Sequence, residues 1–160
     1  MKVLVAVDGS QCSDRAVEEV ARRPWPDGTT LKAISVFEPP PLMTMPDTWA
    51  PPDDFYEKLE KASEDQARTA AETAASRLRA AHAGKAEITT GVLRGRARDA
   101  IVDEADRWGA DLIVLGSHGY RGFTRFWLGS VSHAVANHAH CSVEIVRSGC
   151  ADSAGKARKS

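Results

Sequence analysis

Residues 3–10 of the chain read VLVAVDGS, an unbroken apolar run that ends at an acid, a glycine and a serine. Such a run is typical of a strand that is buried on both faces of a parallel sheet. Ser10 can cap the next segment, in which apolar residues recur at helical spacing until the prolines and glycine of residues 24–28. Residues 3–28 therefore predict a strand followed by a helix, which is the repeating unit of an α/β fold.

Strands and helices alternate along the rest of the chain. Further strands are expected at residues 30–37, 87–92, 112–116 and 143–147, and further helices at residues 55–82, 97–108 and 130–139. This order predicts an α/β fold with a doubly wound, open parallel sheet, helices on both faces and the two most apolar strands at its centre. Residues 1–148 are expected to form one domain, and residues 149–160 a disordered tail.

Composition and charge argue against several classes of function. The 160 residues include 21 Lys and Arg against 22 Asp and Glu, a net charge of −1, so the chain lacks the positive field of a general nucleic-acid binder. No apolar run approaches the roughly 20 residues that span a bilayer. Asp8 comes too early for the apolar core of a secretory signal. We therefore expect a cytoplasmic protein with no nucleic-acid partner and no membrane partner.

Two glycine-containing turns follow the two most apolar strands. Residues 8–10 read DGS and residues 116–119 read GSHG. In an open α/β sheet, ligands bind in the crevice beyond the carboxyl ends of the strands, where the strand order reverses. The two turns are therefore expected to meet at a binding crevice.

The second of these turns opens a longer motif of the form G-x2-G-x9-G-[ST], made by Gly116, Gly119, Gly129 and Ser130. Glycines let backbone N–H groups face a phosphate without a Cβ in the way. A helix that begins at Gly129 and Ser130 directs its unpaired N–H groups toward the same anion, and the hydroxyls of Ser130 and Ser132 can donate to it. The alternative interpretation is that these glycines only form tight turns.

With these motifs, the chain resembles the universal stress protein family over residues 1 to about 148. The resemblance rests on residues 7–10 (VDGS), 109–119 (GADLIVLGSHG) and 128–132 (LGSVS). It implies a five-stranded parallel sheet of order 3-2-1-4-5. Because the glycine motif is complete, the chain looks like the branch of the family that binds ATP.

The resemblance also implies roles for individual residues. Asp8 would contact the ribose or lie beside the nucleotide, and the backbone of Val36 would read the edge of the adenine. An acid at the end of a central strand can accept hydrogen bonds from sugar hydroxyls, although an Asx turn is its structural alternative. The predicted nucleotide-binding residues are Asp8, Ser10, Val36, Gly116, His118, Gly119, Gly129, Ser130, Val131 and Ser132.

The predicted function is that of an ATP-binding stress-response or regulatory protein, in which the nucleotide acts as a conformational or partner switch with little or no turnover. One alternative is a slow Mg-dependent ATPase or another ATP-using enzyme, which needs a metal ion and a base or positioned water. The sequence has no Walker lysine, and only Ser130 with Asp8 could help a Mg²⁺ ion, so we assign no catalytic residue and leave the need for Mg²⁺ open. Another alternative is a nucleotide-independent adaptor that binds an unknown protein partner through the proline-rich residues 39–52.

The histidines near the C-terminus lack the spacing of a metal site. His133 and His138 are five residues apart, which is about 140° around a helix, whereas helical zinc sites use a spacing of four. His140 and Cys141 add no such pair. We therefore expect no metal site, and His118 is the one histidine that we expect near phosphate.

The last strand carries departures from the family pattern. Members of the family commonly form homodimers by pairing this edge strand with that of a second copy, and the resemblance implies the same here. Glu144 interrupts the apolar strand, and Ser142 stands where the family has proline. A charge on an edge strand discourages such pairing, so a homodimer is expected with its geometry left open. Ala97, at a helix start, also replaces a proline.

Overall fold

The computed structural model describes residues 1–40, 52, 54–119 and 128–147. Its strands are β1 (Lys2–Ala6), β2 (Thr30–Phe37), β3 (Glu87–Arg94), β4 (Leu112–Gly116) and β5 (Ser142–Val146). Its helices are α1 (Gln11–Arg22), α2 (Phe55–Ala81), α3 (Ala97–Trp108) and α4 (Ser130–His138). Most of the proline-rich segment at residues 39–52 and the expected tail at residues 149–160 lie outside the described residues.

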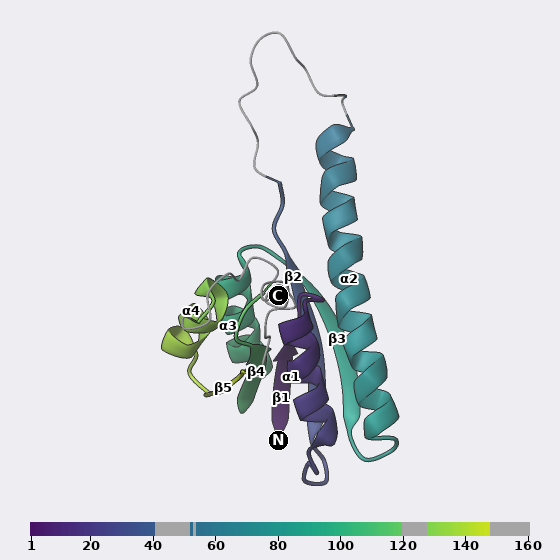
Figure 1. Cartoon of the computed structure of the whole chain (residues 1–160), viewed down its shortest axis with the longest axis vertical. Coiled ribbons are helices and arrows are strands. Elements are labelled where there is room, and N and C mark those ends of the chain that lie inside the picture. The colour runs from purple at the N-terminus through teal and green to yellow at the C-terminus, as the bar shows by residue number, and fades with distance from the viewer. Residues whose placement is uncertain (41–51, 53, 120–127, 148–160) are drawn as a thin grey trace, which may run out of the picture.

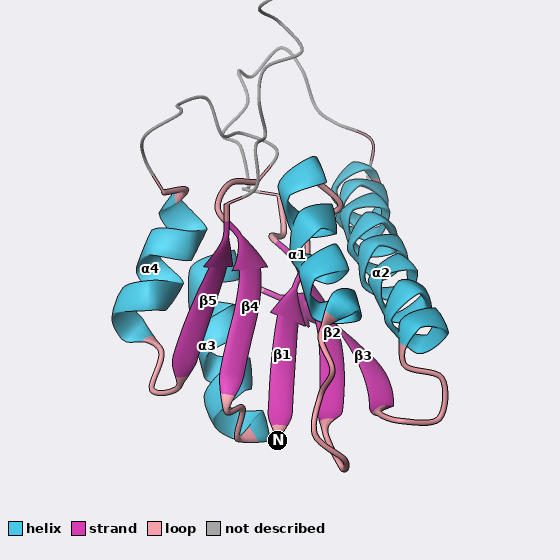
Figure 2. Cartoon of the chain, turned by 60° about the horizontal axis from the view of Figure 1, so that its bottom comes forward, coloured by secondary structure: helices cyan, strands magenta, loops and turns pink. Residues whose placement is uncertain are grey.

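The strands form one parallel sheet in the order β3-β2-β1-β4-β5, which confirms the predicted fold (Figure 2). β1 lies at the centre, where it pairs with β2 on one side and with β4 on the other. The strand order reverses between β1 and β4, so the switch point of the sheet lies at the ends of these two strands.

The sheet separates two hydrophobic cores because successive side chains of a strand point to opposite faces. Val3 and Val5 of β1 pack with α1 and α2 on one face. Leu4, which lies between them, packs with α3 and α4 on the other. All three are fully buried, which explains why β1 reads as a continuous apolar run rather than an alternating one.

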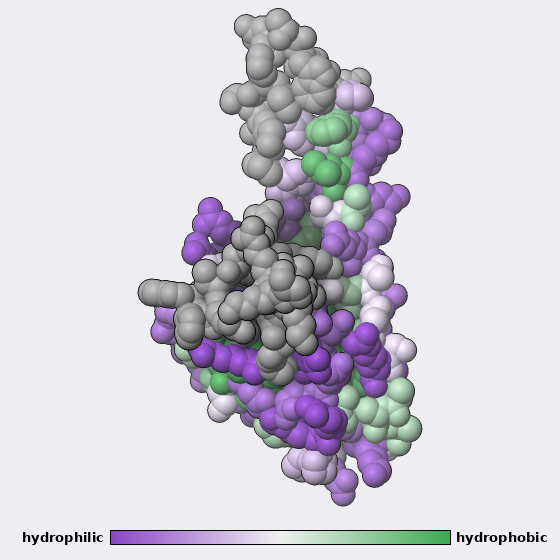
Figure 3. Space-filling view, viewed as in Figure 1, coloured by the Kyte–Doolittle hydropathy of each residue, from purple (hydrophilic) through white to green (hydrophobic). Residues whose placement is uncertain are grey.

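Helix α2 is longer than the sheet that it covers. Its buried residues lie between Ala67 and Leu78, and most of them are alanines that allow close packing. The N-terminal part of α2 projects beyond the sheet (Figure 1), and the side chains of Phe55 and Leu59 near its start are 36% and 44% exposed. Figure 3 shows hydrophobic surface on this projecting part. Among the helices of the described residues, none is long and apolar enough to cross a membrane.

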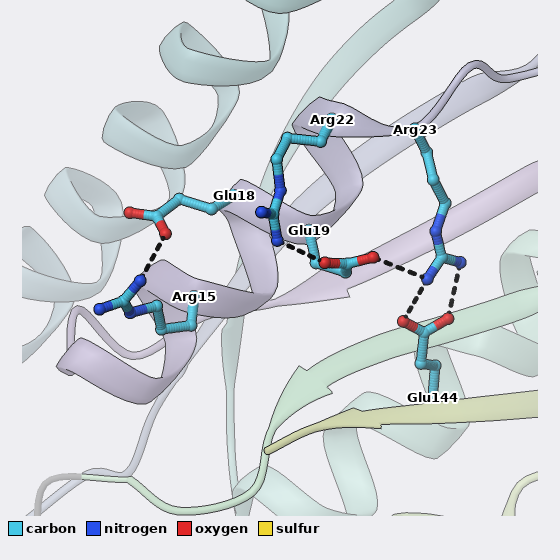
Figure 4. A network of polar contacts seen from close by, with 6 residues as sticks. All are labelled: Arg15, Glu18, Glu19, Arg22, Arg23 and Glu144. Atoms are coloured by element: carbon cyan, nitrogen blue, oxygen red, sulfur yellow. Dashed lines mark hydrogen bonds and ion pairs between the residues drawn. The ribbon is translucent and has the colours of Figure 1, made fainter. Parts of the chain in front are cut away.

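The edge strand β5 is fastened to α1 by an ion-pair network (Figure 4). The guanidinium of Arg23 donates to both carboxylate oxygens of Glu144, at 2.7 and 2.6 Å, and also to Glu19 at 3.2 Å. The hydrogen bond to Glu144 raises the pKa of Arg23, and the bonds from Arg23 and Arg22 lower the pKa of Glu19. The charge of Glu144 is therefore directed at α1 and neutralised there.

Candidate functional site

A pocket of about 500 Å³ opens at the carboxyl ends of β1, β2 and β4, on the face that carries α3 and α4. Nine of the ten residues predicted to bind nucleotide line it: Asp8, Val36, Gly116, His118, Gly119, Gly129, Ser130, Val131 and Ser132. Ser10 does not. Its hydroxyl accepts a hydrogen bond from the backbone N–H of Ser13 at 3.3 Å and caps α1. The structure thus brings together residues from three strand ends and the start of α4.

Asp8 lies at the turn between β1 and α1, where the strand order reverses. Its Oδ1 atom accepts the backbone N–H of Ser10 at 2.9 Å, so the Asx turn is present. Its Oδ2 atom lies so close to Gly119 that a Cβ there would be only 2.6 Å away. The glycine therefore leaves room for a carboxylate in the pocket wall.

The end of β4 and the start of α4 are held together by hydrogen bonds to one carbonyl group. The carbonyl oxygen of Ser117 accepts the N–H of Gly129 at 2.8 Å, and the buried hydroxyl of Ser132 lies 3.0 Å from it. The same hydroxyl is 3.0 Å from the carbonyl oxygen of Gly129. Ser132 is thus engaged within the framework, which leaves Ser130 as the serine whose hydroxyl is available to a ligand.

The N-terminus of α4 faces the pocket without a side-chain cap. Gly129 occupies the N-cap position and has no side chain to accept a hydrogen bond from the first turn. Ser130 and Val131, the first two helical residues, line the pocket. Uncapped N–H groups and the positive end of the helix dipole favour an anion at this point.

His118 contributes a buried nitrogen atom that lacks a partner. Its Nδ1 atom lies 3.1 Å from the hydroxyl oxygen of Ser117. Its Nε2 atom is buried and has no hydrogen-bond partner among the described residues. Buried polar atoms are nearly always paired, so an unpaired one at a pocket indicates a missing partner.

Val36 presents backbone groups at the point where β1 stops pairing with β2. The last bond between these strands is donated by the N–H of Val7 to the carbonyl of Ile34, at 2.9 Å. Backbone groups alternate sides along a strand, and the carbonyl of Phe37 accepts the N–H of Gly95 on the β3 side. The N–H and carbonyl of Val36 therefore point toward β1, beyond the last paired residue, and provide a donor and an acceptor in the pocket wall.

The other lining residues escaped the sequence analysis. Ile34, Ala97 and Ile101 make the wall around Val36 apolar, and Glu38 adds a carboxylate at the mouth. Ile34 and Glu38 had a local signal, since each lies two residues from Val36 in the chain. The helical residues reach the pocket through the packing of α3. No lysine or arginine is found among the described lining residues.

Metal-binding residues do not converge in the described part of the chain. No group of three or more His, Cys, Asp or Glu side chains there could hold a metal ion. The Nδ1 atom of His140 lies 2.9 Å from Asp106, and His133 contacts Asn137 on its own helix.

The model of the universal stress protein family matches residues 1–147. The chain belongs to the universal stress protein family, which confirms the resemblance seen in the sequence.

Curated relatives agree with this assignment. Universal stress protein YxiE of Bacillus subtilis is 30% identical over 148 residues, covering 91% of this chain and 98% of the relative. Universal stress protein Rv1996 of Mycobacterium tuberculosis is 31% identical over 153 residues, covering 90% of this chain. The match covers 47% of that relative, so the chain spans about half its length.

Solved structures share the fold. UspA from Lactobacillus plantarum superposes with a TM-score of 0.69 at 25% identity, covering 92% of this chain and 97% of that one. A universal stress protein in complex with cAMP has a TM-score of 0.58 at 27% identity, with coverage of 92% and 97%. The Archaeoglobus fulgidus protein in complex with dAMP has a TM-score of 0.54 at 26% identity, with coverage of 92% and 98%.

Proposed function

We propose that this protein binds an adenine nucleotide in the pocket at the carboxyl ends of β1, β2 and β4, and that the nucleotide acts as a switch with little or no turnover. The uncapped N-terminus of α4 at the pocket is the observation that carries the proposal. The related structures in complex with cAMP and dAMP support the choice of adenine. ATP is the proposed ligand. The titrations described below test whether Mg²⁺ binds with it.

In this proposal the phosphates lie against the start of α4. The N–H groups of Ser130 and Val131 and the hydroxyl of Ser130 donate to phosphate oxygens, and Gly119 and Gly129 keep the approach free of side chains. The unpaired Nε2 atom of His118 is a further donor when it carries the proton.

The base lies at the other end of the pocket. The carbonyl of Val36 accepts the amino group of adenine, and its N–H donates to the adjacent ring nitrogen. Ile34 and Ile101 supply apolar surface for the faces of the ring. Asp8 lies between the two ends of the pocket, where its Oδ2 atom can accept hydrogen bonds from the ribose hydroxyls.

We favour a switch over an ATPase because phosphoryl transfer needs a base or a positioned water in addition to bound phosphates. One oxygen of Asp8 already accepts the N–H of Ser10, and the other is proposed to accept from the ribose hydroxyls, so this carboxylate is not assigned the role of base. Such a switch would act in the stress-response role of the family, through a domain that we propose to be residues 1–148.

We also propose a homodimer that forms through β5. The ladder of β4 and β5 leaves the outer edge of β5 unpaired within the described residues. Glu144 does not block this edge, because its carboxylate points at Arg23, the residue that follows α1, rather than along the sheet plane. The predicted repulsion at the edge is therefore reduced, and a second copy can extend the sheet.

Isothermal titration calorimetry with ATP, cAMP and dAMP, each with and without Mg²⁺, tests the nucleotide proposal. Ser130→Asp is the informative variant, because an acid in the first turn stabilises a helix but repels phosphate. We expect Ser130→Asp to fold normally and to lose at least tenfold in nucleotide affinity. Ser76→Asp, the same change at an exposed position of α2, is the matched control. Equal affinity of all three proteins would contradict the proposed site.

A further inference from the structure

Glu38 lines the pocket two residues beyond Val36, just after the end of β2. Side chains two residues apart on an extended strand point to the same face, about 6.6 Å apart. Pro39 follows Glu38, and a residue before proline is restricted to an extended backbone. The alternation of β2 therefore continues through Glu38 and directs its carboxylate to the pocket face.

The carboxylate of Glu38 has no hydrogen bond or ion pair with any other described residue. The two residues that follow Glu38 cannot supply a backbone donor, because Pro39 and Pro40 have no N–H groups. Arg94, which ends the neighbouring strand β3, donates instead to Glu60 of α2 at 2.8 Å. The sequence and the packing thus leave an unpaired acceptor at the mouth of the pocket, next to the backbone groups of Val36.

Resting on the proposed nucleotide site, we propose that Glu38 is a specificity-determining residue, which selects a base with an exocyclic amino group over a base with a carbonyl at that position. The amino group of adenine carries two N–H bonds. One is directed at the carbonyl of Val36, and the other is directed away from the ring toward the next side chain on the pocket face, which is Glu38, just after the end of β2. A carboxylate accepts this second bond and repels a carbonyl oxygen.

The contribution of Glu38 can be separated from that of Val36. Both backbone groups of Val36 remain in any side-chain variant, so they discriminate between bases equally in every protein compared. Glu38→Gln keeps the size of the side chain, removes the charge and adds an amide that can donate to a carbonyl. Loss of one negative charge raises the affinity for every nucleotide triphosphate alike, so the ratio of two affinities cancels that effect.

The test compares ATP with inosine triphosphate, which carries a carbonyl where adenine carries its amino group. Affinities are measured by calorimetry for the parent, Glu38→Gln and the control Glu72→Gln, an exposed carboxylate of α2. The parent and the control are expected to prefer ATP strongly. In Glu38→Gln the ratio of the two affinities is expected to fall about tenfold, the size of one charge-assisted hydrogen bond.

An unchanged ratio in Glu38→Gln, with ATP still bound, would overturn the specificity role and leave the nucleotide pocket standing. Failure of the parent to bind either nucleotide would overturn the proposed function and this inference together. A fall of the same size in Glu72→Gln would also overturn it, because the effect would then be general to surface charge.

Discussion

A Cβ atom on Gly116 would lie 2.7 Å from the backbone carbonyl oxygen of Cys12, and 2.9 Å from the backbone nitrogen of Ser13. The end of β4 therefore touches the first turn of α1 through backbone atoms alone. This close approach gives Gly116 a packing role at the switch point, in addition to the phosphate-binding role expected from the motif.

We predict that Gly116→Ala destabilises the protein by about 1–3 kcal/mol, because neither backbone can move away without disturbing the sheet or the helix. Urea denaturation followed by circular dichroism measures the change in the free energy of unfolding. A variant as stable as the parent would show that α1 can shift at no cost.

Gly119→Ala is predicted to behave differently. Its Cβ would meet the Oδ2 atom of Asp8, the end of a side chain that can rotate, at 2.6 Å. We expect a change in the free energy of unfolding of less than about 1 kcal/mol and a clear loss of nucleotide affinity, because the carboxylate is displaced. A double-mutant cycle with Asp8→Ala checks the cause. If Gly119→Ala weakens binding equally in the Asp8→Ala background, the effect does not pass through Asp8.

Glu104 is predicted to make the stability of the protein depend on pH. Its side chain is 3% exposed, its Oε1 atom accepts from the Nζ of Lys32 at 2.5 Å, and Arg107 donates to its other oxygen. Burial alone would raise the pKa of Glu104, but the hydrogen bonds from Lys32 and Arg107 outweigh it and hold the pKa below its ordinary value of 4.5.

A lowered folded-state pKa stabilises the protein above pH 4.5, and this stabilisation is lost as the pH falls through the folded-state value. Glu104→Gln should cost about 3 kcal/mol at pH 7, because it leaves the Lys32 ammonium, which is only 15% exposed, without its charge partner. The penalty should shrink at pH 3, which urea denaturation at both values measures. If Glu104→Gln lowers the free energy of unfolding equally at both pH values, the effect comes from altered packing rather than from the lost charge.

The pair of Arg23 and Glu144 is predicted to couple α1 to the edge strand. A double-mutant cycle with Arg23→Gln and Glu144→Gln should give a coupling of about 1 kcal/mol, since the pair is bidentate and the side chains are 35% and 29% exposed. The pair of Arg15 and Glu18, at 48% and 50% exposed, is the control and should give less than about 0.5 kcal/mol. Equal coupling energies in the two cycles would contradict the attachment of β5 to α1 through Arg23 and Glu144.

Local patterns in the sequence were sufficient to predict the helices and strands and the order in which they follow one another along the chain. The strand at residues 3–7, the helix stop at residues 24–28 and the left-handed glycine after α3, Gly109 with a φ of 71°, each depend on side chains within a few residues. The same holds for the glycine motif, because the phosphate binding that we propose for it was inferred from residues within one loop and one helix start. The strand order came from the family resemblance rather than from any local pattern.

Only the tertiary structure decided which of these residues share the pocket and which serve the framework. Gly116 turned out to admit the backbone of Cys12. Glu38 reaches the pocket mouth, and Glu144 pairs with an arginine 121 residues away in the chain. The physical reason is the same in each case: burial and charge pairing depend on contacts between distant segments, and no periodicity or spacing within one segment records them.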